Sequence, residues 1–237
     1  ILNDLKNEWE GTVKIMFQPG EEVLPGGAKL MIEAGVLENP KVDRALALHV
    51  FPSMETGKVG FRQGMYMAST DELYLTVNGK GGHAAMVNDY INPLIIASEI
   101  ILEVNRRFMK PGALKGTAGE SIPTVVAFGK IEGAGATNVI PSKVELAGTF
   151  RTMDEAWRSN VHQQLIQIVN KISSDYGIDS ELRIEKGYPF LVNDSDFTAL
   201  CEAGARLYMG EAAVETLDLR MTSEDFAFII QKVTSCF

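Results

Sequence analysis

The chain has 237 residues, of which 46% are hydrophobic and 22% charged, and its formal net charge is -9. These proportions are ordinary for a globular protein of one or two domains. The negative charge argues against nucleic acids and anionic membranes as partners. No apolar run approaches the ~20 residues of a membrane-spanning helix. Because Cys201 and Cys236 make no disulfide framework, we expect a reducing compartment, the cytoplasm.

Neither end of the chain has the pattern of a natural terminus. The sequence begins at Ile1 without a methionine and closes at Phe237 without a polar tail. The first residues also lack the basic start and long apolar core of a signal peptide. We interpret the chain as a fragment of a longer protein, and a trimmed mature chain is the alternative.

The first fifty residues predict part of an α/β sheet. Residues 12–18 are apolar and β-branched between Gly11 and Pro19, which predicts a strand. A helical pattern then follows a Gly-Gly pair and ends at Gly35. Residues 45–50 form an uninterrupted apolar run, typical of a strand buried on both faces. A strand, a helix and a strand in this order predict a βαβ unit.

The pattern between residues 70 and 187 indicates a separate α+β domain. Strands are predicted near 71–79, 123–133, 142–150 and 181–187, with helices after Asn92 and Asp154 and a glycine-rich loop over 109–122. The order β-α-β-β-α-β is the ferredoxin-like arrangement. A helix near 195–209, a strand near 214–219 and a helix from Ser223 then return to the α/β pattern. We therefore predict a mixed-sheet α/β domain, residues 1–69 and 188–237, interrupted by an inserted domain of residues 70–187.

Two carboxylates and a histidine follow the predicted strands of the α/β part. Glu21 and Glu22 come after the strand over 12–18, and His49 stands at the end of the strand over 45–50. Open α/β sheets place their sites beyond the carboxyl ends of strands, where these side chains can meet. Neighbouring residues point to opposite sides, so one carboxylate can bind a metal while the other acts as a base. A solvated acidic pair and a core histidine are the alternatives.

Three more polar residues are candidates outside that group. His83 lies in the glycine-rich segment 79–85, where it can donate to a developing oxyanion. Arg151 ends a strand and can hold a substrate carboxylate by a bidentate pair. Asn138 lies in a turn and can orient a substrate. A glycine-rich turn, a structural ion pair and a turn asparagine are the respective alternatives, and we predict that His162 is solvent-exposed on its helix.

Taken together, these segments resemble the M20 metallopeptidase family. The closest branch contains N-acyl-amino-acid amidohydrolases, hippurate hydrolases and auxin-conjugate hydrolases. The matching segments occur in family order at residues 17–22, 26–28, 47–50, 79–85, 138–141, 148–151 and 223–226. The resemblance implies a catalytic domain with an inserted lid and dimerisation domain. It also implies metal-dependent hydrolysis of the amide bond of an N-acyl amino acid or small peptide, with one or two Zn²⁺ or Mn²⁺ ions.

The resemblance implies a role for each matching residue of the α/β part. Glu21 matches the general base that activates the attacking water. Glu22 and His49 match two of the metal ligands.

The resemblance also implies roles for residues of the inserted domain. His83 matches a histidine that, in family dimers, reaches the active site of the partner subunit and stabilises the tetrahedral intermediate. Asn138 and Arg151 match positions associated with the carboxylate end of the substrate. We therefore expect a homodimer formed through residues 70–187.

The sequence departs from the family pattern in its ligands. A Gly-His-Asp-x-His stretch and a C-terminal ligand histidine are absent, and Asn88 stands where the branch often has a second lid histidine. We expect the longer protein to be an amidohydrolase, and these 237 residues alone to bind metal poorly and turn over little. A dipeptidase or carboxypeptidase of the same family and a non-catalytic dimerising binding protein are the alternatives.

Overall fold

The computed structural model describes residues 2–109 and 122–237, which form two compact units. Unit 1 comprises Ile1–Gly64, Val192–Asp218 and Asp225–Phe237, and unit 2 comprises Met65–Leu191 and Leu219–Glu224. The chain passes between the units within the short strands β3 (Gly64–Met67) and β10 (Leu191–Asn193), and again after Asp218 and after Glu224. The predicted loop over 109–122 falls almost entirely outside the described residues.

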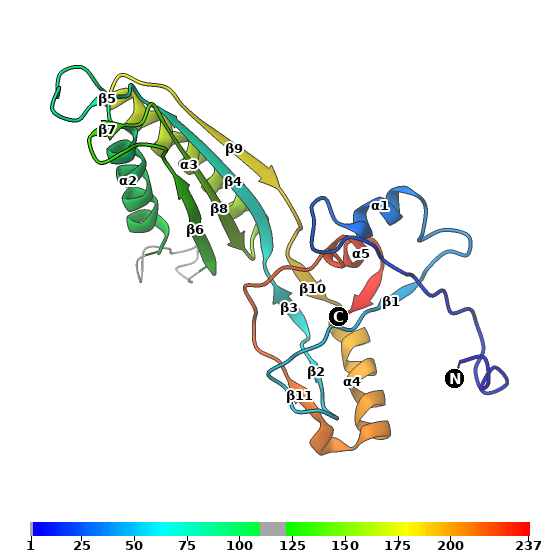
Figure 1. The fold of residues 1–237 in the computed structure, drawn as a ribbon. Helices are drawn as coiled ribbons and strands as arrows, with labels where there is room; N and C mark the ends of the chain where they lie inside the picture. Colours follow the sequence, from blue (N-terminus) through cyan, green and yellow to red (C-terminus); the bar gives the residue numbers. More distant parts are fainter. Residues whose placement is uncertain (1, 110–121) are drawn as a thin grey trace. The chain divides into compact units, whose positions relative to one another are not determined.

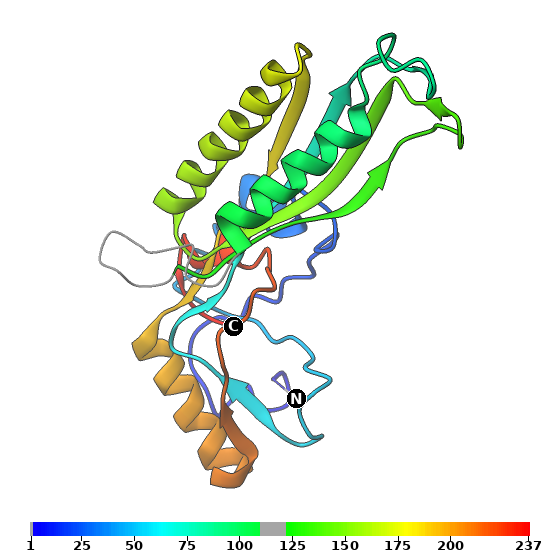
Figure 2. The ribbon, with the colours of Figure 1, turned by 90° about the vertical axis from the view of Figure 1, so that its left-hand side faces the viewer.

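Unit 2 is built on an antiparallel sheet of four strands in the order β6-β8-β4-β9 (Figure 1). The strands are β4 (Ser69–Asn78), β6 (Thr124–Glu132), β8 (Lys143–Thr152) and β9 (Ser180–Lys186). Helix α2 (Pro93–Val104), its π-helical extension η1 (Asn105–Met109) and helix α3 (Glu155–Asp175) complete this part. Both long helices lie along one face of the sheet (Figure 2). Each strand boundary lies within two residues of its predicted position.

Alternation and periodicity explain why these residues form the core of unit 2. Leu73, Leu75 and Val77 on β4 are buried, as their alternation predicts, and they pack against Ile96 and Ile100 of α2 in the same core cluster. Each such side chain contributes roughly 1.5–3 kcal/mol through removal from water.

The two long helices begin where their capping residues predict. The Asn92 side chain accepts a hydrogen bond from the Leu94 backbone N–H at 3.0 Å, and Pro93 occupies the first helical position. The Asp154 side chain accepts from the Trp157 N–H at 2.6 Å.

A short antiparallel ribbon of β5 (Gly82–His83) and β7 (Val139–Ile140) extends unit 2 beyond the sheet, with His83 opposite Val139. The ribbon follows the end of the sheet at which β4 finishes and β8 begins, since the Gly79 N–H donates to the Ser142 carbonyl at 2.8 Å.

Unit 1 contains two short parallel strand pairs and three α-helices among its described residues. Strand β1 (Arg44–Leu46) pairs with β12 (Thr234–Cys236), and β11 (Val214–Thr216) pairs with β2 (Val59–Phe61). The helices are α1 (Gly27–Glu33), α4 (Ser195–Met209) and α5 (Ala227–Ile230), with the 3₁₀ turn η2 (Glu211–Ala213) after α4.

Three sequence-based predictions for unit 1 are wrong or too long. Residues 12–18 are irregular, because no strand in the described part of the chain pairs with them, and a strand exists only through hydrogen bonds to a neighbour. Apolar side chains of this segment remain exposed to solvent, with Phe17 88% exposed. Strand β1 ends at Leu46, before His49, so the expected βαβ unit does not form. The helix predicted from Ser223 begins only at Ala227.

Candidate active site

The two glutamates lie in a tight loop between the irregular segment 12–18 and α1. A β-carbon on Gly27 would stand 1.6 Å from the Pro19 carbonyl oxygen, so the two ends of the loop touch and position 27 requires glycine. The Gly26 N–H donates to the Val23 carbonyl at 3.0 Å. Within this loop Glu21 is half-buried and Glu22 is exposed, as expected for neighbours that point to different sides.

A residue that sequence reasoning left out of the site holds this loop. The Asp225 side chain is completely buried, and its Oδ2 accepts a hydrogen bond from the Ala28 N–H at 2.9 Å. Its Oδ1 accepts from the side-chain amide of Gln18. The Asp225 backbone N–H in turn donates to the Glu21 carboxylate. The family-like segment 223–226 was the available signal for this residue, but no role was assigned to it.

The surroundings of Glu21 suit a general base. Burial raises the pKa of Glu21, and the charges of Glu22 and Asp225 raise it further, against the opposing effects of His49 and of the Asp225 N–H. A carboxylate with a raised pKa accepts a proton more readily at neutral pH. The carboxylate oxygens of Glu21 and Asp225 also come within 4.8 Å of each other.

His49 lies in the same neighbourhood, because its charge acts on Glu21. Its Nδ1 is 2.6 Å from the Val50 carbonyl oxygen, and its ring centroid is 6.4 Å from that of Phe237. An Nδ1–H that donates to a carbonyl leaves the lone pair on Nε2, the nitrogen that then binds a metal.

The donors of this region fit a divalent ion by their chemistry. Exposed Glu22 and His49 offer a carboxylate oxygen and an imidazole nitrogen, the ligand types that both Zn²⁺ and Mn²⁺ accept. Two ligands are fewer than the four of a closed zinc site or the three of a catalytic one. The residues present are therefore compatible with a metal centre but supply only part of it.

The ribbon of unit 2 brings His83 and Asn138 together. The Ala84 N–H donates to the Asn138 carbonyl at 2.9 Å, and the exposed His83 ring accepts the Ala85 N–H at Nδ1, at 3.1 Å. A neutral ring that accepts at Nδ1 carries its proton on Nε2. His83 therefore offers an outward N–H donor, as an oxyanion requires.

Arg151 lies at the other end of the same sheet. It is paired with Thr70 in the register of β8 and β4, and its guanidinium donates to the Met221 carbonyl at 3.1 Å and to the Ser223 hydroxyl at 3.2 Å. Burial lowers the pKa of Arg151. At the rise of an extended strand, the eight residue steps from Lys143 to Arg151 span about 26 Å. Within one copy of unit 2, Arg151 therefore does not lie in one site with His83 and Asn138.

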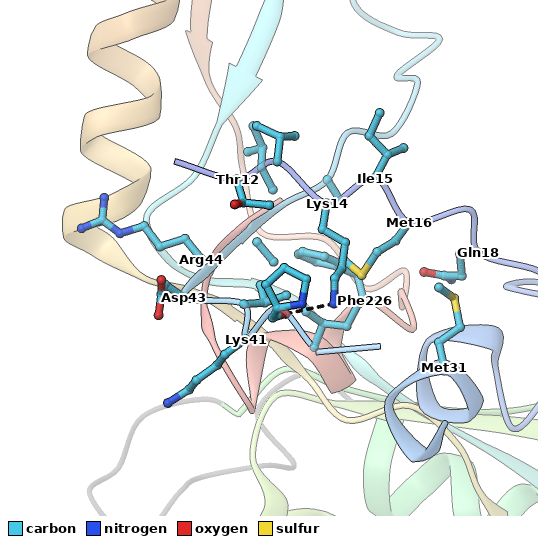
Figure 3. A pocket seen from close by; sticks show the side chains of 17 residues that line it. Thr12, Lys14, Ile15, Met16, Gln18, Met31, Lys41, Asp43, Arg44 and Phe226 are labelled. Atoms are coloured by element: carbon cyan, nitrogen blue, oxygen red, sulfur yellow. Dashed lines mark hydrogen bonds between the residues drawn. The ribbon is translucent and has the colours of Figure 1, made fainter. Parts of the chain in front are cut away.

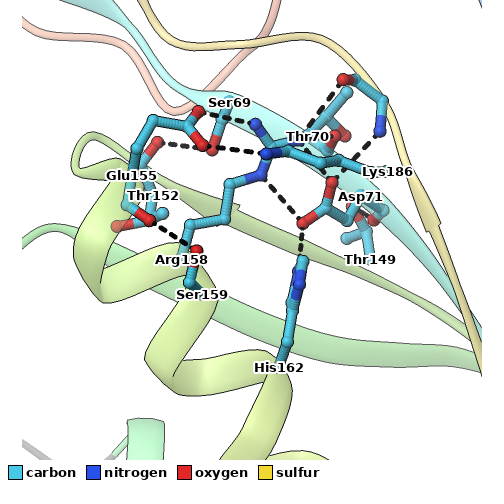
Figure 4. Close-up of polar contacts among 11 residues, drawn as sticks. Ser69, Thr70, Asp71, Thr149, Thr152, Glu155, Arg158, Ser159, His162 and Lys186 are labelled. Atoms are coloured by element: carbon cyan, nitrogen blue, oxygen red, sulfur yellow. Dashed lines mark hydrogen bonds and ion pairs between the residues drawn. The ribbon is translucent and has the colours of Figure 1, made fainter.

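The prediction that His162 is solvent-exposed is wrong. Its Nε2 lies 2.6 Å from Oδ2 of the buried Asp71 on β4 (Figure 4). Its ring also packs edge-on against Phe150. Arg158, one turn earlier on α3, binds the same carboxylate. The helix turns this face toward the sheet because a buried carboxylate needs donors.

One cavity of unit 1 does not contain the predicted site residues. It has a volume of about 1010 Å³ and lies between segment 12–18, residues 40–47, Phe226 and Ile229 (Figure 3). Lys14 crosses it and donates through Nζ to the Pro40 carbonyl at 3.0 Å. Glu21, Glu22 and His49 are not among its lining residues.

The family model for peptidase family M20/M25/M40 matches residues 1–237. The chain belongs to this family. An N-acetylcysteine deacetylase of Bacillus subtilis (strain 168) is 31% identical over 100% of the chain, which covers 60% of that relative. The IAA-amino acid hydrolase ILR1-like 5 of Arabidopsis thaliana is 33% identical over 100% of the chain, which covers 53% of it.

A solved structure agrees with the family assignment. The Bacillus subtilis YXEP protein, described as a dinuclear metal binding peptidase from the M20 family, is 27% identical with a TM-score of 0.71. The alignment covers 100% of this chain and 57% of that protein. The chain is thus mixed α/β, as predicted, and it spans only about half to three fifths of the relatives it matches.

No helix among residues 2–109 and 122–237 is both long enough and apolar enough to cross a membrane.

Proposed function

We propose that the whole protein hydrolyses the amide bond of N-acyl amino acids or small peptides with the help of a divalent metal, Zn²⁺ or Mn²⁺. The observation that carries this proposal is the environment of Glu21: a half-buried carboxylate with a raised pKa, beside the exposed donors Glu22 and His49. The names of the deacetylase and IAA-amino acid hydrolase relatives support an acyl–amino acid amide as substrate. The peptidase description of the solved relative keeps dipeptides as the second candidate.

The proposed mechanism assigns one step to each group. When bound, the metal supplies Lewis acidity to the substrate carbonyl and to water. Glu22 and His49 would hold it. Glu21 takes a proton from the attacking water as the new C–O bond forms, and later delivers that proton to the leaving nitrogen as the C–N bond breaks. The Nε2–H of His83 donates to the oxyanion.

We also propose that residues 70–187 are a ferredoxin-like lid through which two copies dimerise. Strand β6 is an edge of the four-stranded sheet, which leaves its outer hydrogen-bonding groups available for a second strand. Helix α2 exposes Leu94, Ile95 and Leu102, the last at 59%. Because His83 and Arg151 stand at opposite ends of one sheet, a site that uses both groups is more easily completed by two copies.

The catalytic proposal is tested on the longest natural polypeptide that contains this chain, with N-acetyl amino acids and dipeptides as substrates. Glu21→Gln should lower kcat by about 10²–10⁴-fold with bound metal unchanged. Glu22→Gln and His49→Ala should lower the bound metal itself. Glu33→Gln, an exposed glutamate on α1, is the control and should change neither. Full activity of Glu21→Gln would contradict the proposal.

The lid proposal has two tests. Ile95→Glu with Leu102→Glu should convert dimer to monomer in light scattering, whereas Ile166→Glu, an exposed isoleucine on α3, should not. If His83 acts across the dimer, mixing inactive His83→Ala and Glu21→Gln proteins should restore about a quarter of the wild-type activity, since half of the dimers are mixed and each holds one intact site. No recovery from mixed dimers would place His83 in its own subunit's site or outside the reaction.

A further inference from the structure

One buried carboxylate joins both ends of the loop that carries Glu21 and Glu22. Gln18 lies just before this loop and Ala28 just after it, and both donate to the side chain of Asp225. Asp225 stands 207 residues from Gln18 and 197 from Ala28 in the sequence. The Asp225 side chain therefore connects the two ends of the loop. We call its two hydrogen bonds, from Gln18 and Ala28, the clasp.

Both carboxylate oxygens of Asp225 accept hydrogen bonds, as a buried structural carboxylate requires. Each carboxylate oxygen accepts one N–H donor, and hydrogen bonds to an ionised acceptor are stronger than neutral ones. Helix α1 has no side-chain cap at Gly26, and Asp225 supplies the missing acceptor from another segment of unit 1. The burial of a charged group in this place is accounted for by these donors.

The same residue also holds the side chain of Glu21. The Asp225 backbone N–H donates to the Glu21 carboxylate, so Asp225 fixes the loop and the carboxylate on the loop together. Glu22 takes part in none of these hydrogen bonds and remains exposed.

We propose that Asp225 is a positioning residue for Glu21, acting through the Gln18 and Ala28 contacts. The inference rests on the proposed function, in which Glu21 is the general base. Asp225 touches neither substrate nor water in this role. It keeps the base in one orientation, and a loop released at both ends samples orientations in which proton transfer is slow.

The kinetic test compares Asp225→Ala, Gln18→Leu and the double variant in the longest natural polypeptide. Asp225→Ala should lower kcat by about 10–100-fold, the range found when a partner of a catalytic group is lost, with KM and bound metal nearly unchanged. Gln18→Leu should lower kcat less. It should have no further effect in the Asp225→Ala background, because both changes remove the same clasp.

Asp194→Ala is the matched control. Asp194 also lies in unit 1 and caps a helix, accepting the Phe197 N–H at 2.7 Å at the start of α4. Its loss removes the same kind of hydrogen bond without touching the loop of Glu21. It should lower thermal stability but leave kcat unchanged.

Amide hydrogen exchange of the same proteins gives a readout that does not depend on catalysis. Asp225→Ala should accelerate exchange over residues 19–28 and leave α2 unchanged. Unchanged exchange over 19–28, or accelerated exchange with an unchanged kcat, would overturn the proposal. Loss of bound metal in Asp225→Ala would make Asp225 a ligand and overturn it too. If Glu21→Gln is fully active, the proposed function fails, and the exchange result still decides whether the clasp exists.

Discussion

Asp71 on β4 and Arg158 on α3 form an ion pair whose side chains are 0% and 1% exposed. Arg158 Nε donates to Asp71 Oδ2 at 3.0 Å, and a second guanidinium nitrogen donates to Oδ1 and to the Thr70 carbonyl (Figure 4). The Gly187 N–H also donates to Oδ1 of the Asp71 carboxylate, at 3.1 Å. The Asp71 carboxylate thus connects α3 to the beginning of β4 and to the chain that follows β9.

We expect Asp71→Asn to destabilise unit 2 by about 3–5 kcal/mol, because it removes the buried counter-charge of Arg158 and leaves only Glu155, whose side chain is 39% exposed. Urea unfolding followed by Trp157 fluorescence, in a Trp9→Phe background, measures this change. Lys171→Met is the control. It breaks the exposed Lys171–Asp175 pair on the same helix and should leave the unfolding midpoint in place. A similar small effect of both variants would mean that the buried pair contributes little.

The contribution of Asp71 to the free energy of unfolding should disappear in acid. Burial alone would raise the pKa of Asp71, but hydrogen bonds from His162 and Arg158 outweigh it and hold the pKa below the ordinary value of 3.8. Because the folded-state pKa is the lower one, the ionised group stabilises the fold above pH 3.8, and this contribution is lost as the pH falls through the folded-state pKa. The stability difference between wild type and Asp71→Asn should therefore shrink below about pH 3.8.

Gly27→Ala should disrupt the loop of Glu21 and Glu22, because the added methyl group would overlap the Pro19 carbonyl. We expect a loss of at least about 2 kcal/mol, measured by thermal unfolding, since backbone must move to relieve the overlap. Gly204→Ala is the matched control in the middle of α4, where an added β-carbon meets no atom within 4 Å. It should stabilise the protein by about 0.5–1 kcal/mol through helix propensity.

Lys14→Met should loosen the turn after α1. The Lys14 ammonium donates to the carbonyls of Val36 at 2.9 Å, Glu38 at 2.6 Å and Pro40 at 3.0 Å. Losing a charged donor to these groups should cost about 1.5–3 kcal/mol of unfolding free energy. Lys41→Met, an exposed lysine of the same segment, should cause no measurable change, and an equal loss in both would show that the three carbonyls do not need the ammonium.

The two cysteines should resist thiol reagents in the folded protein. Burial raises the pKa of Cys201 to about 11, and burial also raises the pKa of Cys236. Since the thiolate is the reactive form, we expect slow modification at pH 8 and rapid modification of both thiols in urea. Mass spectrometry counts the adducts, and fast labelling of the folded chain would contradict the burial.

The sequence alone determined the four-stranded sheet and the two long helices of unit 2, because their signals are local. The alternation of Leu73, Leu75 and Val77 needs only neighbours along one strand, and Asn92 and Asp154 bond to N–H groups two and three residues away. The prediction of a strand over 12–18 was wrong for the opposite reason, since a strand depends on a partner that its own residues do not encode.

Tertiary structure decided what the polar residues do. His162 has the spacing of an exposed helix residue, and only the position of Asp71, 91 residues earlier in the sequence, makes it a half-buried contact. The same holds for Asp225, whose partners lie nearly two hundred residues away. The sequence contains the carboxylates and histidines of a hydrolytic site, and chain folding determines which carboxylate holds the loop and which is left to act on water, because burial and hydrogen-bond donors are properties of the folded neighbourhood.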